Sequence, residues 1–204
     1  MRLIAGVLLA VALGGCGAAG HGSRSGDGSR PGHGSRSATI PASLLRGERP
    51  IGAGPRFHPA ARGPVIGPCR RALGPRDGVH VELFGAGKVI LVAAGIGTRP
   101  PRKRVAGRIV GARCFGALVT RDPTGVLLVR PGAQLTLADL FGSWGRPLGR
   151  RRLLSFPGPV TAYVGGRRWR GAVGAIPLRR HAEIVVEVGP HVPPHRVFRF
   201  PPGS

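Results

Sequence analysis

The chain has 204 residues and a formal net charge of +23, from 31 Lys and Arg residues against 8 Asp and Glu residues. Only 5% of the residues are aromatic, so the flat side chains on which nucleic-acid bases stack are scarce. Because all but two of the basic residues are arginines, we attribute the charge to the codon bias of a GC-rich genome and expect no nucleic-acid partner.

The first fifteen residues have the features of an export signal. Arg2 precedes eleven apolar residues, Leu3–Leu13, which as a helix would reach only about 16 Å across a hydrocarbon core of about 30 Å. The run is too short to span a membrane and is typical of a signal-peptide core. The residues Leu13-Gly14-Gly15-Cys16 resemble the lipobox of bacterial lipoproteins, whose cysteine carries a diacylglyceryl group. We predict a signal peptide over residues 1–15 and a lipidated Cys16 on the extracytoplasmic face of the cell membrane; an ordinary signal peptide with a chance cysteine is the alternative.

Composition divides the rest of the chain into a tether and a domain. Residues 17–40 are low-complexity Gly, Ser and Arg, and residues 41–68 remain rich in Pro, Gly and Arg. Such segments have too little apolar surface to offset the entropy lost on ordering, so we predict a disordered tether over 16–68. The remainder is long enough for a core of its own, and we predict a single β-rich domain over 69–204.

Short β-branched runs separated by Gly and Pro predict strands throughout this domain. The glycine-containing segments 85–87 and 165–166 are expected to form tight turns. The predicted strands are Val79–Phe84, Lys88–Val92, Gly107–Val110, Cys114–Thr120, Gly125–Val129, Val160–Val164, Glu183–Val188 and Val197–Phe200.

The segment 136–145 has a helical pattern, with four apolar residues on one face. Thr136 with Asp139 three residues later is a variant of the capping box that starts helices, and Gly145 followed by Pro147 ends the pattern. We expect this helix to pack across a sheet. The predicted fold class is therefore α+β, mainly β, with one short helix.

If Cys16 is lipidated, two cysteines remain, and an even number suits an oxidising compartment. We predict a disulfide between Cys69 and Cys114, which closes a loop of 45 residues. In the chain-entropy account such a loop stabilises the fold by about 4 kcal/mol. Two free buried thiols are the alternative, and a zinc pair is less favoured because the chain has no C-x-x-C motif.

Seven segments of the domain resemble, in order, the motifs of a family of uncharacterised exported or membrane-anchored bacterial proteins. The family motifs are H-x-H-L, V-P-A-G-I-G, Cys followed by L-H-T-H-D, G-I-I-H-I-E, T-L-G-x-F-F-x-x-W-G-x-P-L, V-N-G and L-x-x-H-x-x-I. The helix motif is the most specific of them. The matching segments here are 78–81, 92–97, Cys114 with 118–122, 125–129, 136–148, 164–166 and 178–184.

The resemblance implies a His-rich site for a transition metal, of which this chain keeps only part. The other His positions of the H-x-H and L-H-T-H-D motifs carry Gly, Val and Arg here, and the matching residues that remain are His80, Asp122 and His181. Glu82 alternates with His80 along a strand, so its carboxylate lies on the same face. A copper- or zinc-binding envelope protein with a partly lost site is therefore our second functional hypothesis, and a structural, hydrogen-bonded His80 is the alternative.

Basic residues cluster at three places that we predict contact an anionic surface: Arg102, Lys103 and Arg104; Arg150, Arg151 and Arg152; and Arg167, Arg168 and Arg170. Beside a membrane such clusters attract anionic lipids and wall polymers, although they would equally suit a solvated face. No nucleophile stands in motif spacing with a base, so we expect no enzyme and no cofactor. The leading hypothesis is a non-catalytic envelope module that binds anionic lipid, wall polymer or a protein partner.

Overall fold

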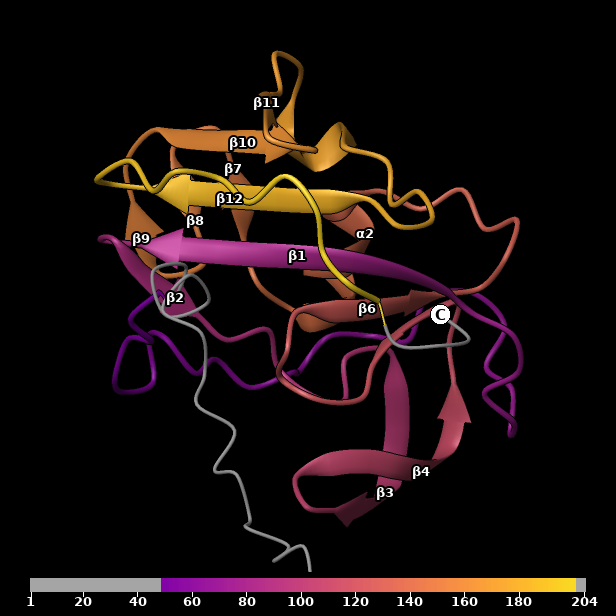
Figure 1. Cartoon of the computed structure of the whole chain (residues 1–204). Helices are drawn as coiled ribbons and strands as arrows, with labels where there is room; N and C mark the ends of the chain where they lie inside the picture. The colour runs from indigo at the N-terminus through magenta and orange to yellow at the C-terminus, as the bar shows by residue number, and fades with distance from the viewer. Residues whose placement is uncertain (1–48, 201–204) are drawn as a thin grey trace, which may run out of the picture. The chain divides into compact units, whose positions relative to one another are not determined.

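The computed structural model describes residues 49–200, which form a strand-rich domain with one short α-helix (Figure 1). The predicted signal peptide, Cys16 and the tether up to residue 48 lie outside the described residues. The predicted α+β, mainly β class is confirmed. The elements are β1 (Asp77–Gly85), β2 (Lys88–Ile90), β3 (Thr98–Val105), β4 (Arg108–Phe115), β5 (Leu118–Thr120), β6 (Val126–Val129), α2 (Leu137–Trp144), β7 (Leu148–Gly149), β8 (Arg152–Leu153), β9 (Phe156–Pro157), β10 (Val160–Val164), β11 (Arg167–Arg168), the 3₁₀ helix η1 (Val173–Ala175) and β12 (Glu183–Val188).

Strands β1 and β12 lie at the centre of the large sheet, whose order is β11-β10-β12-β1-β6-β5. β1 and β12 are parallel, and their other neighbours are antiparallel. β2 pairs with the end of β1 through a two-residue turn in which Ala86 and Gly87 both have positive φ, of 52° and 74°. This is the geometry that joins twisted strands in a tight hairpin, so the predicted turn is confirmed.

One face of the sheet packs against α2, which lies behind it in Figure 1. The backbone amide of Thr136 donates a hydrogen bond to Asp139 Oδ2 at 2.7 Å, and Gly145 ends the helix with a φ of 70°. Both predicted helix signals are confirmed. The helix and the strands share a core whose completely buried members include Val79, Leu83, Leu127, Leu137, Leu140, Trp144, Ile184 and Val186.

Residues 49–68 lie on this domain, although the sequence placed them in the tether. The amide of Gly52 donates to the carbonyl of Val89 at 3.0 Å, and the buried indole of Trp144 donates to the carbonyl of Pro59 at 3.2 Å. The prediction of a disordered tether is therefore wrong for residues 49–68. Their backbone carbonyls accept hydrogen bonds from buried polar groups such as the Trp144 indole, a role that composition does not reveal.

The predicted disulfide between Cys69 and Cys114 is present, with Cα atoms 5.3 Å apart. It joins the segment before β1 to the end of β4. Arg76 adds a second link, because its buried guanidinium donates to the carbonyls of Leu73 and Gly116, each at 2.9 Å. Burial, reinforced by nearby arginines, lowers the pKa of Arg76 to about 10.

The strand prediction departs from the structure where the apolar pattern is misleading. The predicted strand Cys114–Thr120 is divided between β4, which ends at Phe115, and β5, which begins at Leu118. β3 was missed because its sequence, TRPPRKRV, is polar and exposed and contains two prolines; it pairs with β4 alone. The segment Val197–Phe200 is not a strand. It belongs to the C-terminal segment (residues 190–200), whose aromatic rings pack on the sheet instead of joining its hydrogen-bond ladder.

Candidate functional site

A row of polar residues lies on the sheet face opposite α2. Side chains alternate along a strand, so His80, Glu82 and Phe84 share one face of β1, as Glu183 and Glu187 do on β12. The parallel register places His80 directly opposite Glu183. The pairing of two distant strands therefore creates an imidazole–carboxylate pair at the centre of the sheet.

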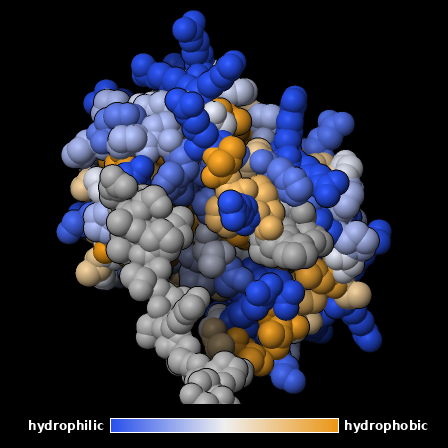
Figure 2. Space-filling model, in the orientation of Figure 1, coloured by the Kyte–Doolittle hydropathy of each residue, from blue (hydrophilic) through white to orange (hydrophobic). Residues whose placement is uncertain are grey.

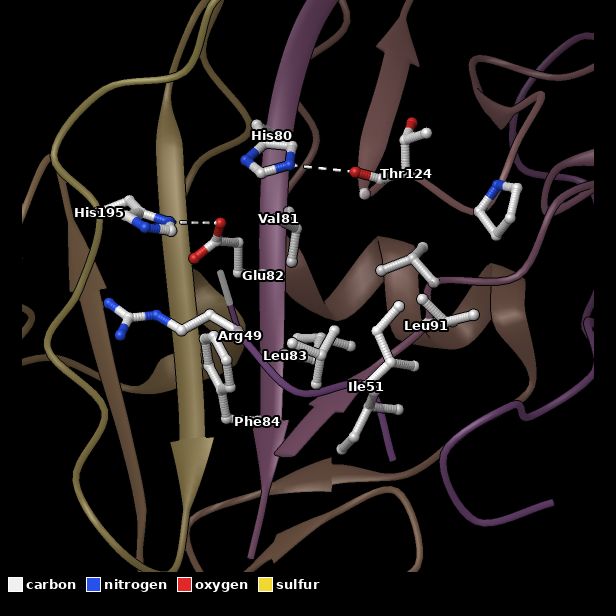
Figure 3. Close-up of a pocket in the computed structure, with 15 residues that line it drawn as sticks. Arg49, Ile51, His80, Val81, Glu82, Leu83, Phe84, Leu91, Thr124 and His195 are labelled. Carbon is white, nitrogen blue, oxygen red and sulfur yellow. Dashed lines mark hydrogen bonds and ion pairs between the residues drawn. The ribbon is translucent and has the colours of Figure 1, made fainter. Parts of the chain in front are cut away.

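His80 and Glu183 form a buried pair. The Nδ1 of His80 lies 2.8 Å from Glu183 Oε2, and the side chains are 6% and 2% exposed. On the other side of the ring, Nε2 donates to the carbonyl of Thr124 at 3.1 Å (Figure 3). Burial raises the pKa of the Glu183 carboxyl, and the hydrogen bond and charge of His80 oppose that rise. Because a carbonyl oxygen only accepts, the contact with Thr124 requires a hydrogen on Nε2, and Nδ1 is the ring nitrogen directed at Glu183.

Glu82 pairs with the C-terminal segment. Its Oε1 lies 2.7 Å from Nδ1 of His195, the contact drawn in Figure 3. Its second oxygen, Oε2, and Oε1 of Glu183 are both buried without a hydrogen-bond partner among the described residues. One ligand atom from each of His80, Glu82 and Glu183 lies within 4.8 Å of the others. These three side chains are therefore close enough to hold one ion.

In a second carboxylate–histidine pair further along the same face, both carboxylate oxygens have hydrogen-bond partners. Glu187 Oε1 lies 2.9 Å from His191 Nδ1 and accepts from the hydroxyl of Tyr163 at 3.2 Å. Its Oε2 accepts from the amide of Val192 at 2.9 Å. Burial first, and then the charge and hydrogen bond of Glu187, raise the pKa of Tyr163. This pair fastens the start of the C-terminal segment to β12.

The C-terminal segment covers this polar face and crosses β12 and β1 (Figure 1). The ring of Phe198 stacks on His80 with centroids 3.7 Å apart. Beside this contact a cavity of about 310 Å³ is lined by His80, Glu82, Thr124 and His195 and by apolar residues of β1 and β2. His80 is therefore covered by one ring, and His80 and Glu82 border a cavity of small-ligand size.

No protein-family profile, curated protein or solved structure matches this chain. In the part of the chain that the structure describes, no helix is long and apolar enough to cross a membrane.

The structure separates the three residues that the sequence grouped as metal ligands. His80 belongs to the cluster, whereas Asp122 accepts from the Thr124 hydroxyl and pairs with Arg108 at 3.6 Å. His181, with a φ of 58°, stacks on Phe200. The cluster instead takes Glu82, which strand alternation placed beside His80, and Glu183, which depends on a strand register that the sequence does not reveal.

The predicted basic contact residues are on the surface. All nine are exposed except Arg102, which is half-buried and donates to the hydroxyl and the carbonyl of Thr98 at 2.7 Å each. Long hydrophilic side chains project from several edges of the molecule in Figure 2. The cluster of Arg102, Lys103 and Arg104 lies on β3, which forms a two-stranded hairpin with β4. This hairpin stands away from the large sheet in Figure 1.

Proposed function

We propose that the protein is a lipid-anchored extracytoplasmic module that binds the anionic membrane surface through its β3–β4 hairpin. The observation that supports this most strongly is the charge of that hairpin. Residues 98–115 carry no acidic residue and six basic ones: Arg99, Arg102, Lys103, Arg104, Arg108 and Arg113. All of these except Arg102 are exposed. The proposal requires binding alone and assigns no catalytic residue.

The hairpin has a fixed direction on the domain. Its root is joined to the N-terminal segment by the disulfide at Cys114. Further out, the amide of Ile109 donates to the carbonyl of Arg121 at 2.7 Å, and Nε of Arg121 donates back to the Ile109 carbonyl at 2.8 Å. These bonds hold the backbone of the hairpin in place, so little of its conformational entropy is lost when the hairpin binds.

Exposed apolar residues favour lipid over a soluble polymer. Val105 and Val110 lie in the outer half of the hairpin and are 55% and 40% exposed. Apolar side chains among cations suit the boundary between lipid headgroups and acyl chains, where both kinds of group are stabilised. The predicted lipid at Cys16 would hold the domain beside such a surface, so even weak attraction would orient it.

Vesicle binding tests this proposal. Residues 16–204 with Cys16→Ser, which lack both acyl chains and signal peptide, are titrated with phosphatidylglycerol or phosphatidylcholine vesicles at low and high salt. We expect binding to phosphatidylglycerol alone, weakened strongly by salt because exposed charges are screened within about 10 Å at 0.1 M. Equal binding to both lipids, or binding that salt leaves unchanged, would contradict the proposal. Binding to purified anionic wall polymer but to neither lipid would identify the polymer as the partner instead.

A further inference from the structure

We propose that His80, Glu82 and Glu183 form a binding site for a divalent transition-metal ion of the zinc type. This inference is independent of the hairpin proposal, because its residues belong to β1 and β12 and take no part in the β3–β4 hairpin. The three side chains come from β1 and β12 and lie close together. His80 and Glu82 also line the cavity beside the C-terminal segment.

The donor set and its spacing suit zinc. Zinc binds imidazole nitrogen and carboxylate oxygen at about 2.0–2.2 Å, which places two tetrahedral ligands about 3.3 Å apart. The Nδ1 of His80 and Oε2 of Glu183 are now 2.8 Å apart, in contact through a proton. An ion that replaces this proton needs the two atoms to separate by about half an ångström, which a carboxylate rotation achieves without moving the strands.

The ring of His80 is already oriented as metal-bound imidazoles are. A ligating histidine usually donates its other N–H to a carbonyl or carboxylate, which fixes the tautomer. Here Nε2 donates to the carbonyl of Thr124, so the lone pair of a neutral ring is on Nδ1, the atom that faces Glu183. The Phe198 ring stacked on the imidazole further limits its rotation.

Two oxygen atoms of the cluster require a partner. Glu183 is 3% exposed, and within residues 49–200 its buried Oε1 has no hydrogen-bond partner, nor has Oε2 of Glu82. Buried acceptors of this kind are costly unless a proton donor, water or ion satisfies them. A divalent ion held by both oxygens of Glu183 and by Oε2 of Glu82 would satisfy both atoms and balance two carboxylate charges. The cation that also lines the cavity, Arg49, directs Nη2 to the carbonyl of Pro193 at 2.6 Å.

His195 has a positioning role. Its Nδ1 contacts Glu82 Oε1 and so holds the carboxylate that would ligate through Oε2. Loss of an outer contact of this type typically lowers metal affinity 10- to 100-fold, less than the loss of a ligand. The C-terminal segment would thereby couple its own attachment to metal binding.

Zinc binding by the full chain in detergent tests the proposal. The protein is stripped with a chelator and titrated with Zn²⁺ against a fluorescent zinc indicator, and Co²⁺ is then used to record the visible absorption of the coordinated ion. We expect one tightly bound Zn²⁺ per chain. His80→Asn and Glu183→Gln should each weaken binding at least 100-fold and abolish the Co²⁺ bands, and His195→Asn should weaken binding roughly 10- to 100-fold.

Glu187→Gln is the matched control, because Glu187 is buried on the same face of the same strand and pairs with a histidine, but both of its oxygens are satisfied. It should leave Zn²⁺ affinity unchanged, as should Asp122→Asn. The proposal is overturned if the wild-type chain binds neither Zn²⁺ nor Co²⁺, if Glu187→Gln weakens binding as much as Glu183→Gln, or if Asp122→Asn abolishes it. The wild-type result does not depend on whether any variant folds.

Discussion

Replacement of Cys69 and Cys114 together by serine should lower the free energy of unfolding by about 4 kcal/mol. The bond closes a loop of 45 residues. In the chain-entropy account the unfolded chain loses about 13 cal/mol/K for a loop of this length, which at 25 °C corresponds to about 4 kcal/mol. For a domain whose total stability is about 5–15 kcal/mol, this is a large fraction.

Urea unfolding of the wild type and the double serine variant measures this difference, with tryptophan fluorescence as the probe because Trp144 is completely buried. The midpoint should fall, while the slope with urea should rise, since an uncrosslinked chain exposes more surface on unfolding. A loss below about 1 kcal/mol would refute the reasoning and would mean that Arg76 and the core already hold this segment in place.

Two further predictions concern single residues. The chain has one tyrosine, so phenolate absorbance in a pH titration reports Tyr163 alone. The titration midpoint should lie above the ordinary tyrosine pKa of about 10 and should fall toward that value in Glu187→Gln. An unchanged midpoint in this variant would contradict the contact between Tyr163 and Glu187. Since the folded-state pKa is raised, the associated stability is present below pH 10 and is lost as the pH rises through the folded pKa. Asp139→Ala should cost about 1 kcal/mol in thermal or urea unfolding, because the amide of Thr136 loses its acceptor, and a neutral result would show that the cap does not contribute.

The sequence was sufficient to predict features that depend on local chemistry. The strand around His80, the strand Glu183–Val188 and the helix cap at Thr136 all follow from alternation, helical spacing and capping, which act over a few residues. The disulfide followed from counting cysteines. Each of these signals lies within one element or in the residue types themselves.

Features that depend on long-range register were not predictable from the sequence. Glu183 lies opposite His80 because two strands about a hundred residues apart are parallel and in one particular register, and no local pattern encodes that register. The course of residues 49–68 and of the C-terminal segment was missed for the same reason, since both are irregular chains stabilised by contacts with a surface formed elsewhere in the sequence. The cluster of His80, Glu82 and Glu183 is therefore a tertiary feature.

The most direct test of the account compares two charge-neutralising variants of residues 16–204 carrying Cys16→Ser. In one, Arg99, Lys103 and Arg104 of the hairpin become Gln; in the other, Arg150, Arg151 and Arg152, which are also exposed, become Gln. Both lose three charges, and each basic residue near an anionic surface contributes about 1 kcal/mol. We predict that the hairpin variant binds phosphatidylglycerol vesicles roughly 100-fold more weakly and that the other variant binds nearly as the wild type does. Equal losses in the two variants would show that only net charge matters and would contradict the assignment of the hairpin as the binding surface.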